Sequence, residues 1–357
     1  MKLNGWLLRA AGIVALIGLL PVAAAADGKR GTVVTEQLAS SVLRETRTGV
    51  DPNRQVSVYL PPGYADSGKS YPVVYFFHSL NWSGPQVFSD GRMQGLLERG
   101  FASGTVKEFI LVAADFSSPP GMGSLYENSA TSGRWLDFVT QELVPFVDGK
   151  FRTLRARESR GLAGDFMGGR GALKLAMTHA NLFSVVYALH PVATGNGSLP
   201  WGALAIDWKR VHEAKTLADL DGPGREKIFV QISQAFLPNP ARPPFYCDFP
   251  VEWENGQPKP NGEHVRRAQR AFLLDESLDE AAANLRTMRG IAFDWGRFDT
   301  TVAHVDANRD FSRKLADLGI EHEAEEFNGD PWNRYWNEDG RVASRVLPFF
   351  GRRLVFD

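Results

Sequence analysis

The segment Gly164–Gly169 has the glycine spacing of a turn that presents a catalytic nucleophile. It reads Gly-Asp-Phe-Met-Gly-Gly, and the motif G-x-S-x-G places a serine hydroxyl on a sharp turn between a strand and a helix. Because Gly164 and Gly168 are the outer glycines, the central residue is Phe166. A benzyl side chain has no oxygen that could attack a carbonyl carbon. The sequence therefore predicts the scaffold of a serine nucleophile without the nucleophile.

Acid–base chemistry at this turn would need a histidine at the same end of the sheet. His190 follows an apolar run at a predicted strand end, which is the edge where ligands bind in open α/β folds. His304 lies further along the chain, shortly after Asp299. Both are possible substitutes for a catalytic histidine, although the simpler interpretation of each is a polar residue in a loop or at the edge of the core. Asp165 is a poor substitute nucleophile, because it lies one position before the centre of the turn and should point away from the active face.

Alternating strands and helices must position these residues. Strands are predicted at Arg54–Leu60, Tyr71–Phe77, Phe109–Ala114, Phe183–Leu189, Gly290–Trp295 and Ile320–Phe327. Amphipathic or apolar helices are predicted at Arg134–Val147, Gly169–His179, Val305–Leu318 and Arg341–Phe350. Most of the strand segments are continuous apolar runs, as expected for strands buried on both faces. This alternation predicts an α/β fold with a mainly parallel central sheet flanked by helices.

The pattern is interrupted between about residues 195 and 289, where proline and tryptophan become frequent. A stretch of this length is too long for an ordinary connection between two elements. We therefore expect an inserted cap or lid over the carboxyl edge of the sheet. Part of it, Lys227–Ile232, is also compatible with a further strand of the sheet.

The N-terminal 26 residues have the build of a secretory signal peptide. A positively charged start with Lys2 and Arg9 precedes an apolar run, and small residues up to Ala26 offer a cleavage site. The apolar run is shorter than the roughly 20 residues that span a bilayer, so no stable membrane span is expected after cleavage. The sequence predicts an exported protein, periplasmic or secreted, whose α/β domain occupies residues 27–357.

Composition excludes several other classes of protein. The 357 residues carry a formal net charge of −1, which argues against a nucleic-acid partner or a polybasic membrane surface. The single cysteine, Cys247, excludes an intramolecular disulfide. The seven histidines show no paired spacing typical of metal ligands. We therefore expect neither a metal nor a cofactor; the oligomeric state is left open.

Blocks spread along the chain resemble the esterase branch of the α/β-hydrolases, which includes esterase D-like enzymes, feruloyl esterases and mycolyltransferases. The matching blocks are Tyr71–His78, Tyr126–Ser129, Gly133–Trp135, Glu142–Pro145, Phe151–Thr153, Arg160–Gly164 and Leu347–Phe350. Members of this family usually read Gly-His-Ser-Met-Gly-Gly at the turn. The present chain departs from that pattern at Asp165 and Phe166. The resemblance implies an α/β-hydrolase fold with carboxylic-ester hydrolase ancestry.

The resemblance also assigns positions for the other two members of a Ser-His-Asp triad. Asp299 lies just beyond a predicted strand, where the family places its carboxylate, and would orient the catalytic imidazole; a loop aspartate that caps the following helix is the alternative. Family members carry Gly-Asp-His before the last helix, where this chain reads Gly329-Asp330-Pro331. Pro331 thus occupies the histidine position, and a proline cannot act as a general base.

The oxyanion hole of such a site is formed by backbone N–H groups. Met167, which follows the nucleophile position, fills the first donor role. The second donor falls near Ser79 and Leu80, and Ser79 stands where the family usually has glycine, so a tight backbone conformation there could be altered. A bulky Phe166 could also relax the strained turn and remove the oxyanion geometry.

Three functional hypotheses follow. The first is an exported α/β-hydrolase-fold protein that has lost the serine and histidine of the triad and binds a small ester, acyl ligand or protein partner. The second is an active carboxylic-ester hydrolase with a non-standard nucleophile or a displaced histidine. The third is a purely structural or interaction domain, which predicts a filled pocket. Because triad members act as a unit, the loss of two of them favours the first hypothesis.

Overall fold

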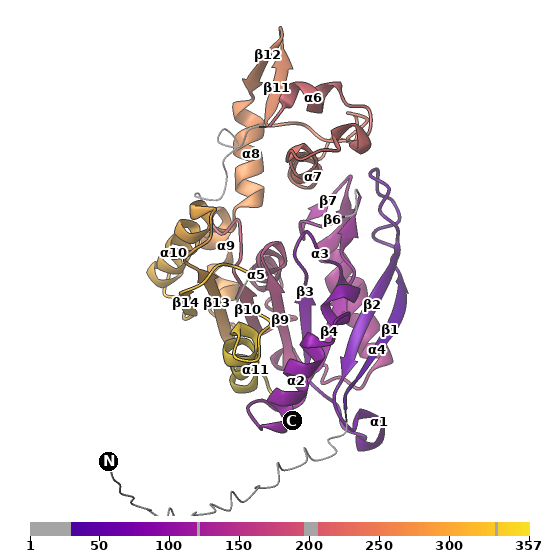
Figure 1. Ribbon diagram of the computed structural model, residues 1–357, viewed down its shortest axis with the longest axis vertical. Helices are drawn as coiled ribbons and strands as arrows, with labels where there is room; N and C mark the ends of the chain where they lie inside the picture. The colour runs from indigo at the N-terminus through magenta and orange to yellow at the C-terminus, as the bar shows by residue number, and fades with distance from the viewer. Residues whose placement is uncertain (1–29, 120–121, 196–205, 333–334) are drawn as a thin grey trace, which may run out of the picture.

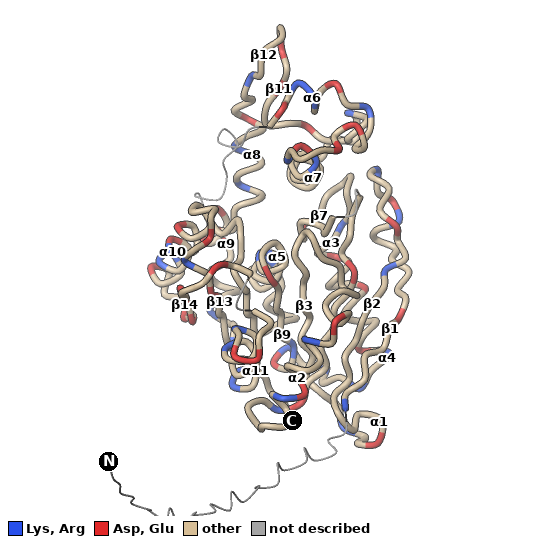
Figure 2. The backbone as a smooth tube through the Cα atoms, in the orientation of Figure 1, with Lys and Arg blue, Asp and Glu red and all other residues tan. Residues whose placement is uncertain are grey.

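The structure is a computed structural model that describes residues 30–119, 122–195, 206–332 and 335–357. The predicted signal peptide, residues 1–26, lies outside the described residues. Within the described ranges, none of the helices combines the length and the apolar character needed to cross a membrane. Lysine and arginine are interspersed with aspartate and glutamate along the surface elements (Figure 2).

Eight strands form one central sheet in the order β1-β2-β4-β3-β9-β10-β13-β14. Their bounds are β1 Thr32–Ala39, β2 Asn53–Leu60, β3 Val73–Phe77, β4 Ile110–Ala114, β9 Arg160–Asp165, β10 Val185–Leu189, β13 Gly290–Gly296 and β14 Glu323–Phe327. Strand β2 runs antiparallel to both of its neighbours, β1 and β4, and the pairs from β4 to β14 are parallel. The predicted α/β class and the mainly parallel sheet are confirmed.

Helices cover both faces of this sheet (Figure 1). These helices include α2 Arg92–Ala102, α5 Met167–Thr178, α9 Leu278–Leu285, α10 Val302–Asp317 and α11 Leu347–Arg353. A further helix, Trp135–Lys150, consists of α3 Trp135–Asp137, a π-helical part Phe138–Leu143 and α4 Val144–Lys150. Helices α2 and α11 contribute to one apolar cluster, whereas α4, α5, α9 and α10 contribute to the other. The predicted helices are therefore present, with shifts of a few residues at their ends.

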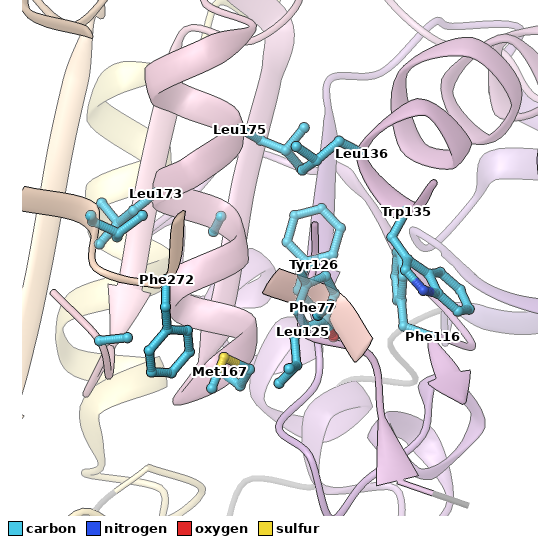
Figure 3. Packing of buried hydrophobic residues seen from close by; sticks show 14 of the residues in the cluster. Phe77, Phe116, Leu125, Tyr126, Trp135, Leu136, Met167, Leu173, Leu175 and Phe272 are labelled. Carbon is cyan, nitrogen blue, oxygen red and sulfur yellow. The ribbon is translucent and has the colours of Figure 1, made fainter. Parts of the chain in front are cut away.

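The larger apolar cluster, to which α4, α5, α9 and α10 contribute, contains a group of aromatic rings beside α5 (Figure 3). The rings of Phe77, Phe116 and Tyr126 lie with centroids 4.9–5.3 Å apart, and Trp135 packs against Phe116 (Figure 3). Aromatic contacts at such distances add about 0.5–1.5 kcal/mol per pair beyond the burial of their area. A Cβ atom on Gly171 of α5 would lie 2.5 Å from Tyr126 Cγ, so this group packs directly against α5.

The segment between β10 and β13 contributes no strand to the central sheet in its described parts, residues 190–195 and 206–289. It holds α6 Trp208–Glu213, α7 Glu226–Phe236, the hairpin β11 Val251–Glu254 and β12 Gln257–Pro260, α8 Gly262–Phe272 and then α9. Elements α6 to α8 lie at one end of the sheet (Figure 1), and α9 packs against α5. The possible strand at Lys227–Ile232 is wrong, because this run is the first half of α7. Periodicity cannot distinguish a short apolar strand from a buried helical segment.

Arg170 joins this inserted region to α5. Its guanidinium is fully buried and donates to the carbonyl oxygens of Leu125 (3.1 Å), Ala271 (3.0 Å) and Phe272 (2.9 Å). It also forms an ion pair with Glu127 at 3.3 Å. A buried cation that satisfies carbonyl groups of the loop at Leu125 and of the C-terminal end of α8 fixes both segments relative to α5, the helix that carries it.

Candidate active site

The turn at Phe166 keeps the strained backbone of a nucleophile turn. Strand β9 ends at Asp165, α5 begins at Met167, and Phe166 between them has φ 51° and ψ −113°. A positive φ at a bulky residue costs of order 1–3 kcal/mol and needs support from the surroundings. A Cβ atom on Gly168 would lie 2.0 Å from the carbonyl oxygen of Phe77. The glycine allows the first turn of α5 to approach β3 closely, and the expectation that Phe166 relaxes the turn is wrong.

The ring of Phe166 lies between two other rings. It stacks on Trp332 with centroids 4.1 Å apart and an interplanar angle of 9°. On its other side it stacks on His190, with centroids 4.9 Å apart. Trp332 is 54% exposed, so this stack forms a wall that meets solvent. Trp332 was not predicted as a site residue, and its position directly after Pro331 is the only signal for it in the sequence.

The structure brings His190, Asp299 and His304 together. Asp299 Oδ2 lies 2.9 Å from His190 Nε2 and 2.8 Å from His304 Nδ1. The hydrogen-bond partners fix the tautomer of His190, because Gly296 N–H donates to its Nδ1 at 3.1 Å. His190 must then carry its proton on Nε2 and donate to Asp299. His304 donates from Nδ1, which leaves the lone pair of its Nε2 available.

Asp299 is held as a carboxylate by three donors. Besides the two histidines, Thr301 N–H donates to Oδ1 at 2.8 Å. Burial alone would raise the pKa of Asp299, but these hydrogen bonds outweigh it and hold the pKa well below its usual range. Burial lowers the pKa of His190, so this ring stays neutral beside the carboxylate. The arrangement reproduces the acid–imidazole half of a catalytic triad.

The same three side chains could in principle hold a metal ion, since their ligand atoms all lie within 4.8 Å of one another. Sequence spacing did not reveal this cluster, because its histidines are far apart in the chain. A metal ligand must offer a lone pair, whereas the Gly296 N–H keeps the Nε2 proton on His190. The hydrogen bonding thus favours a proton-bearing Asp–His pair over a metal centre.

The residues on either side of Pro331 in the chain contact residues of the site, which places Pro331 next to it. Phe298 N–H donates to the carbonyl of Gly329 at 3.1 Å, which ties the segment to the residues just after β13. Pro331 is buried, and Trp332 beyond it covers Phe166. The segment in which the family resemblance expects a histidine is therefore close to the turn and contributes an indole ring.

A cavity of about 240 Å³ connects the predicted oxyanion residues with His304. Ser79, Leu80, Phe166, Met167 and His304 all line it. Met167 is the first residue of α5, and N–H groups of a first helical turn lack intrahelical acceptors. No hydrogen-bond acceptor for the N–H of Met167 or of Leu80 is found among the described residues. Both groups are therefore available to a ligand.

The loop that carries Ser79 and Leu80 is anchored by the buried His78. Its Nε2 accepts from Phe116 N–H at 3.0 Å, so Nδ1 carries the proton and donates to the Ser79 carbonyl at 2.9 Å. The carbonyl of His78 accepts from the Tyr126 hydroxyl at 2.6 Å. Ser79 is not among the described residues with positive φ. The change from glycine to serine therefore requires no strained conformation here.

Asp165 points away from the cavity, as expected. In the parallel register it lies level with Leu189, which packs in the cluster on the α2 and α11 side, and residues at one level share a face. Its Oδ1 is buried without a partner among the described residues. Burial raises the pKa of Asp165 to about 7, and hydrogen bonds from backbone N–H groups offset this only in part.

This raised pKa predicts that Asp165 destabilises the protein as pH increases. An unfolded aspartate titrates near pH ~3.9, so from about pH 4 to pH 7 the folded chain holds a proton that the unfolded chain has released. The free energy of unfolding is therefore highest, as far as Asp165 is concerned, below the pKa of the unfolded state, and it falls as pH rises through the pKa of the folded state. Compared with Asp165→Asn, the wild type should lose on the order of 4 kcal/mol between pH 4 and pH 8, at 1.36 kcal/mol per pKa unit. Urea unfolding of both proteins across this range measures the difference; parallel curves would show that Asp165 is already ionised at low pH.

Comparisons with known proteins identify the family. A sequence model of the family described as "Putative esterase" matches residues 48–339. Esterase Rv1288 of Mycobacterium tuberculosis is 28% identical over 282 residues, which are 78% of this chain and 52% of that protein. The chain thus spans about half the length of that relative. The S-formylglutathione hydrolase of Paracoccus denitrificans is 31% identical over 200 residues, covering 51% of this chain and 70% of that enzyme.

Solved structures share the fold. A ferulic acid esterase matches with a TM-score of 0.64 at 20% identity, over 91% of this chain and 99% of the other. The S-formylglutathione hydrolase FrmB of Staphylococcus aureus matches with a TM-score of 0.56 at 14% identity, over 89% and 98% of the two chains. The family match and the mainly parallel sheet agree, and the chain belongs to this esterase family of the α/β-hydrolase superfamily.

Proposed function

We propose that this protein binds a small carboxylic ester or acyl ligand non-covalently, in the cavity beside Phe166, and that it forms no acyl-enzyme. The observation that carries this proposal is the benzyl ring at the nucleophile position, on a turn that keeps a nucleophile's backbone. The chemistry of an acyl-enzyme needs an oxygen or sulfur nucleophile at this point. In the exported protein that the sequence predicts, this would be a binding function built on an esterase scaffold.

The lining of the cavity supports a partly apolar ligand. Helix α7 contributes Ile228, Phe229 and Ile232, and the Phe166–Trp332 stack forms an aromatic wall. Small-molecule sites are mostly apolar and carry a few placed polar groups. Here Arg225 and Asn81 are two of those groups, and no ion-pair partner of Arg225 is found in the described part of the chain. A ligand with a flat apolar body and a polar end fits this lining.

A purely structural role predicts a filled pocket, and the cavity argues against it. The cavity of about 240 Å³ is smaller than the roughly 300–1,000 Å³ of sites that hold drug-sized ligands. It therefore suits a small acyl or aryl group. The alternative of an esterase with a displaced histidine is favoured by one observation, the hydrogen bond between His304 and Asp299.

Ligand binding is tested by calorimetry with an uncleavable ester mimic, 4-phenyl-2-butanone. We expect saturable binding to the wild type and a loss of at least about tenfold in affinity on Ile228→Trp, because the indole fills the cavity. Leu217→Trp is the matched control, since Leu217 is also a half-buried apolar residue of the inserted region and does not line the cavity. Intact mass after incubation with a fluorophosphonate probe should be unchanged. Equal affinity of the three proteins, or a covalent adduct on the wild type, would overturn the proposal.

A further inference from the structure

We infer that His304 acts as a general base that activates a water molecule for direct attack on an ester bound in the cavity. The inference rests on the proposed function in one respect, namely that an ester occupies the cavity. It adds an activity that needs no nucleophilic side chain. The geometry that carries it is the placement of one imidazole between a buried carboxylate and a ligand cavity.

The orientation of His304 is that of a base ready to accept a proton. Its Nδ1 lies 2.8 Å from Asp299 Oδ2, and the carboxylate cannot donate because it is ionised. The proton is therefore on Nδ1, and Nε2 carries a lone pair. His304 lines the cavity and is partly exposed to it. No partner for Nε2 is found within the described ranges of the chain.

His190 also holds the carboxylate of Asp299 in place. It is fully buried and donates from Nε2 to the same Asp299 oxygen at 2.9 Å. Its own orientation is fixed by Gly296 N–H and by the Phe166 ring stacked on it. His190 is thus a positioning residue, which limits the directions in which Asp299 can move. A fixed carboxylate in turn fixes the imidazole plane of His304.

The reaction balances with water as the only co-reactant. A water oxygen forms a bond to the carbonyl carbon of the ester while His304 Nε2 takes one of its protons. The negative charge that develops on the carbonyl oxygen is accepted by the N–H groups of Met167 and Leu80, which line the same cavity. The C–O bond to the alcohol then breaks, and the imidazolium returns its proton to the leaving alkoxide. The products are a carboxylic acid and an alcohol, and His304 is neutral again.

This route differs measurably from the serine route. It has no covalent intermediate, so the release of alcohol should show no burst, and a fluorophosphonate should not inhibit it. General-base catalysis contributes about 10²–10⁴-fold, and binding with an oxyanion hole contributes a further 10³–10⁴-fold over water. The expected turnover is therefore far above that of buffer and far below that of a triad enzyme.

The test is steady-state hydrolysis of p-nitrophenyl butyrate by the purified protein and its variants. We expect saturable wild-type turnover without a burst, and His304→Gln and Asp299→Asn each to lower kcat by at least about 100-fold. KM should change by less than threefold, because neither group is expected to hold the ground-state ester. His179→Gln is the control, since His179 lies at the far end of α5 and contacts Thr178; its turnover should equal that of the wild type.

The outcomes separate this inference from the proposed function. If 4-phenyl-2-butanone binds but turnover equals that of buffer, or survives in His304→Gln, the inference fails and the binding function stands. If the ketone does not bind, the proposed function fails. A burst or a covalent adduct would overturn both. Should His304→Gln be poorly folded by circular dichroism, loss of turnover in Asp299→Asn with unchanged ketone binding provides the same decision.

Discussion

Replacing Phe166 with serine is expected to create a serine-dependent esterase, with kcat at least about 10³-fold above that of the wild type. The backbone at this position already has φ 51° and ψ −113°, and the neighbouring N–H of Met167 is available to an oxyanion. His304 and Asp299 already form an acid–imidazole pair. Loss of a triad serine costs about 10⁶-fold in kcat, so partial recovery of that factor is a large effect. Burst kinetics with p-nitrophenyl butyrate and labelling by a fluorophosphonate measure it.

Two further variants identify the histidine that serves the new serine. Phe166→Ala removes the aromatic stack without adding a hydroxyl and should gain no labelling. Phe166→Ser combined with His304→Ala should lose the gain if His304 is the base. Adding Pro331→His should give no further increase, because Asp299 already accepts from two histidines and Thr301. A large gain that requires Pro331→His would instead show that His304 cannot reach the serine.

Replacing Arg170 with methionine is expected to lower the free energy of unfolding by about 3–5 kcal/mol. Methionine fills much of the volume but removes the donor of three carbonyl groups, and it leaves Glu127 with Lys174, at 3.8 Å, as its remaining cationic partner among the described residues. Removing one partner of a buried charged network has costs of this size. A fall in Tm of about 4–7 °C follows for a chain of this length. Urea and thermal unfolding measure the effect.

The matched control for Arg170 is Arg155→Met. Arg155 is exposed and donates to a single carbonyl, that of Asp148, so its loss should cost less than about 1 kcal/mol. Because Arg170 holds the chain at Ala271 and Phe272, its loss should also increase proteolysis near the end of α8 before global unfolding. Equal stability of both variants would show that the four contacts of Arg170 contribute little net free energy.

Much of the central sheet could be predicted from the sequence because its strands are continuous apolar runs. Val73–Phe77 and Ile110–Ala114 are buried on both faces, and a pattern of this kind is readable without knowing the partner strands. The first strand, Thr32–Ala39, was not predicted, because it lies at the sheet edge and mixes exposed with half-buried residues. The inserted region was recognised by composition, but the helix Glu226–Phe236 within it was not.

The candidate site could be predicted only where the chain itself brings residues together. Phe166 and Met167 follow from the spacing of their glycines, and Asp299 follows from its place after a strand. The meeting of His190 with His304 depends on β10 and β13 being neighbours, which no local pattern encodes. The stacking of Trp332 on Phe166 depends on the path of a loop. Such contacts arise from sheet order and loop packing, so a single sequence contains little signal for them.

At Phe166 the strained backbone of a nucleophile turn occurs without a nucleophilic side chain, whereas a serine hydrolase has both. In an active hydrolase the unfavourable backbone of the nucleophile is readily attributed to selection for catalysis. Here the same backbone persists around a side chain that cannot react, and its support is the close packing of Gly168 against the carbonyl of Phe77. The geometry is thus inherited with the architecture of the strand and helix and does not depend on the reaction. Backbone shape alone would therefore group this chain with relatives that carry a serine at this point, and only the side chain of residue 166 distinguishes it from them.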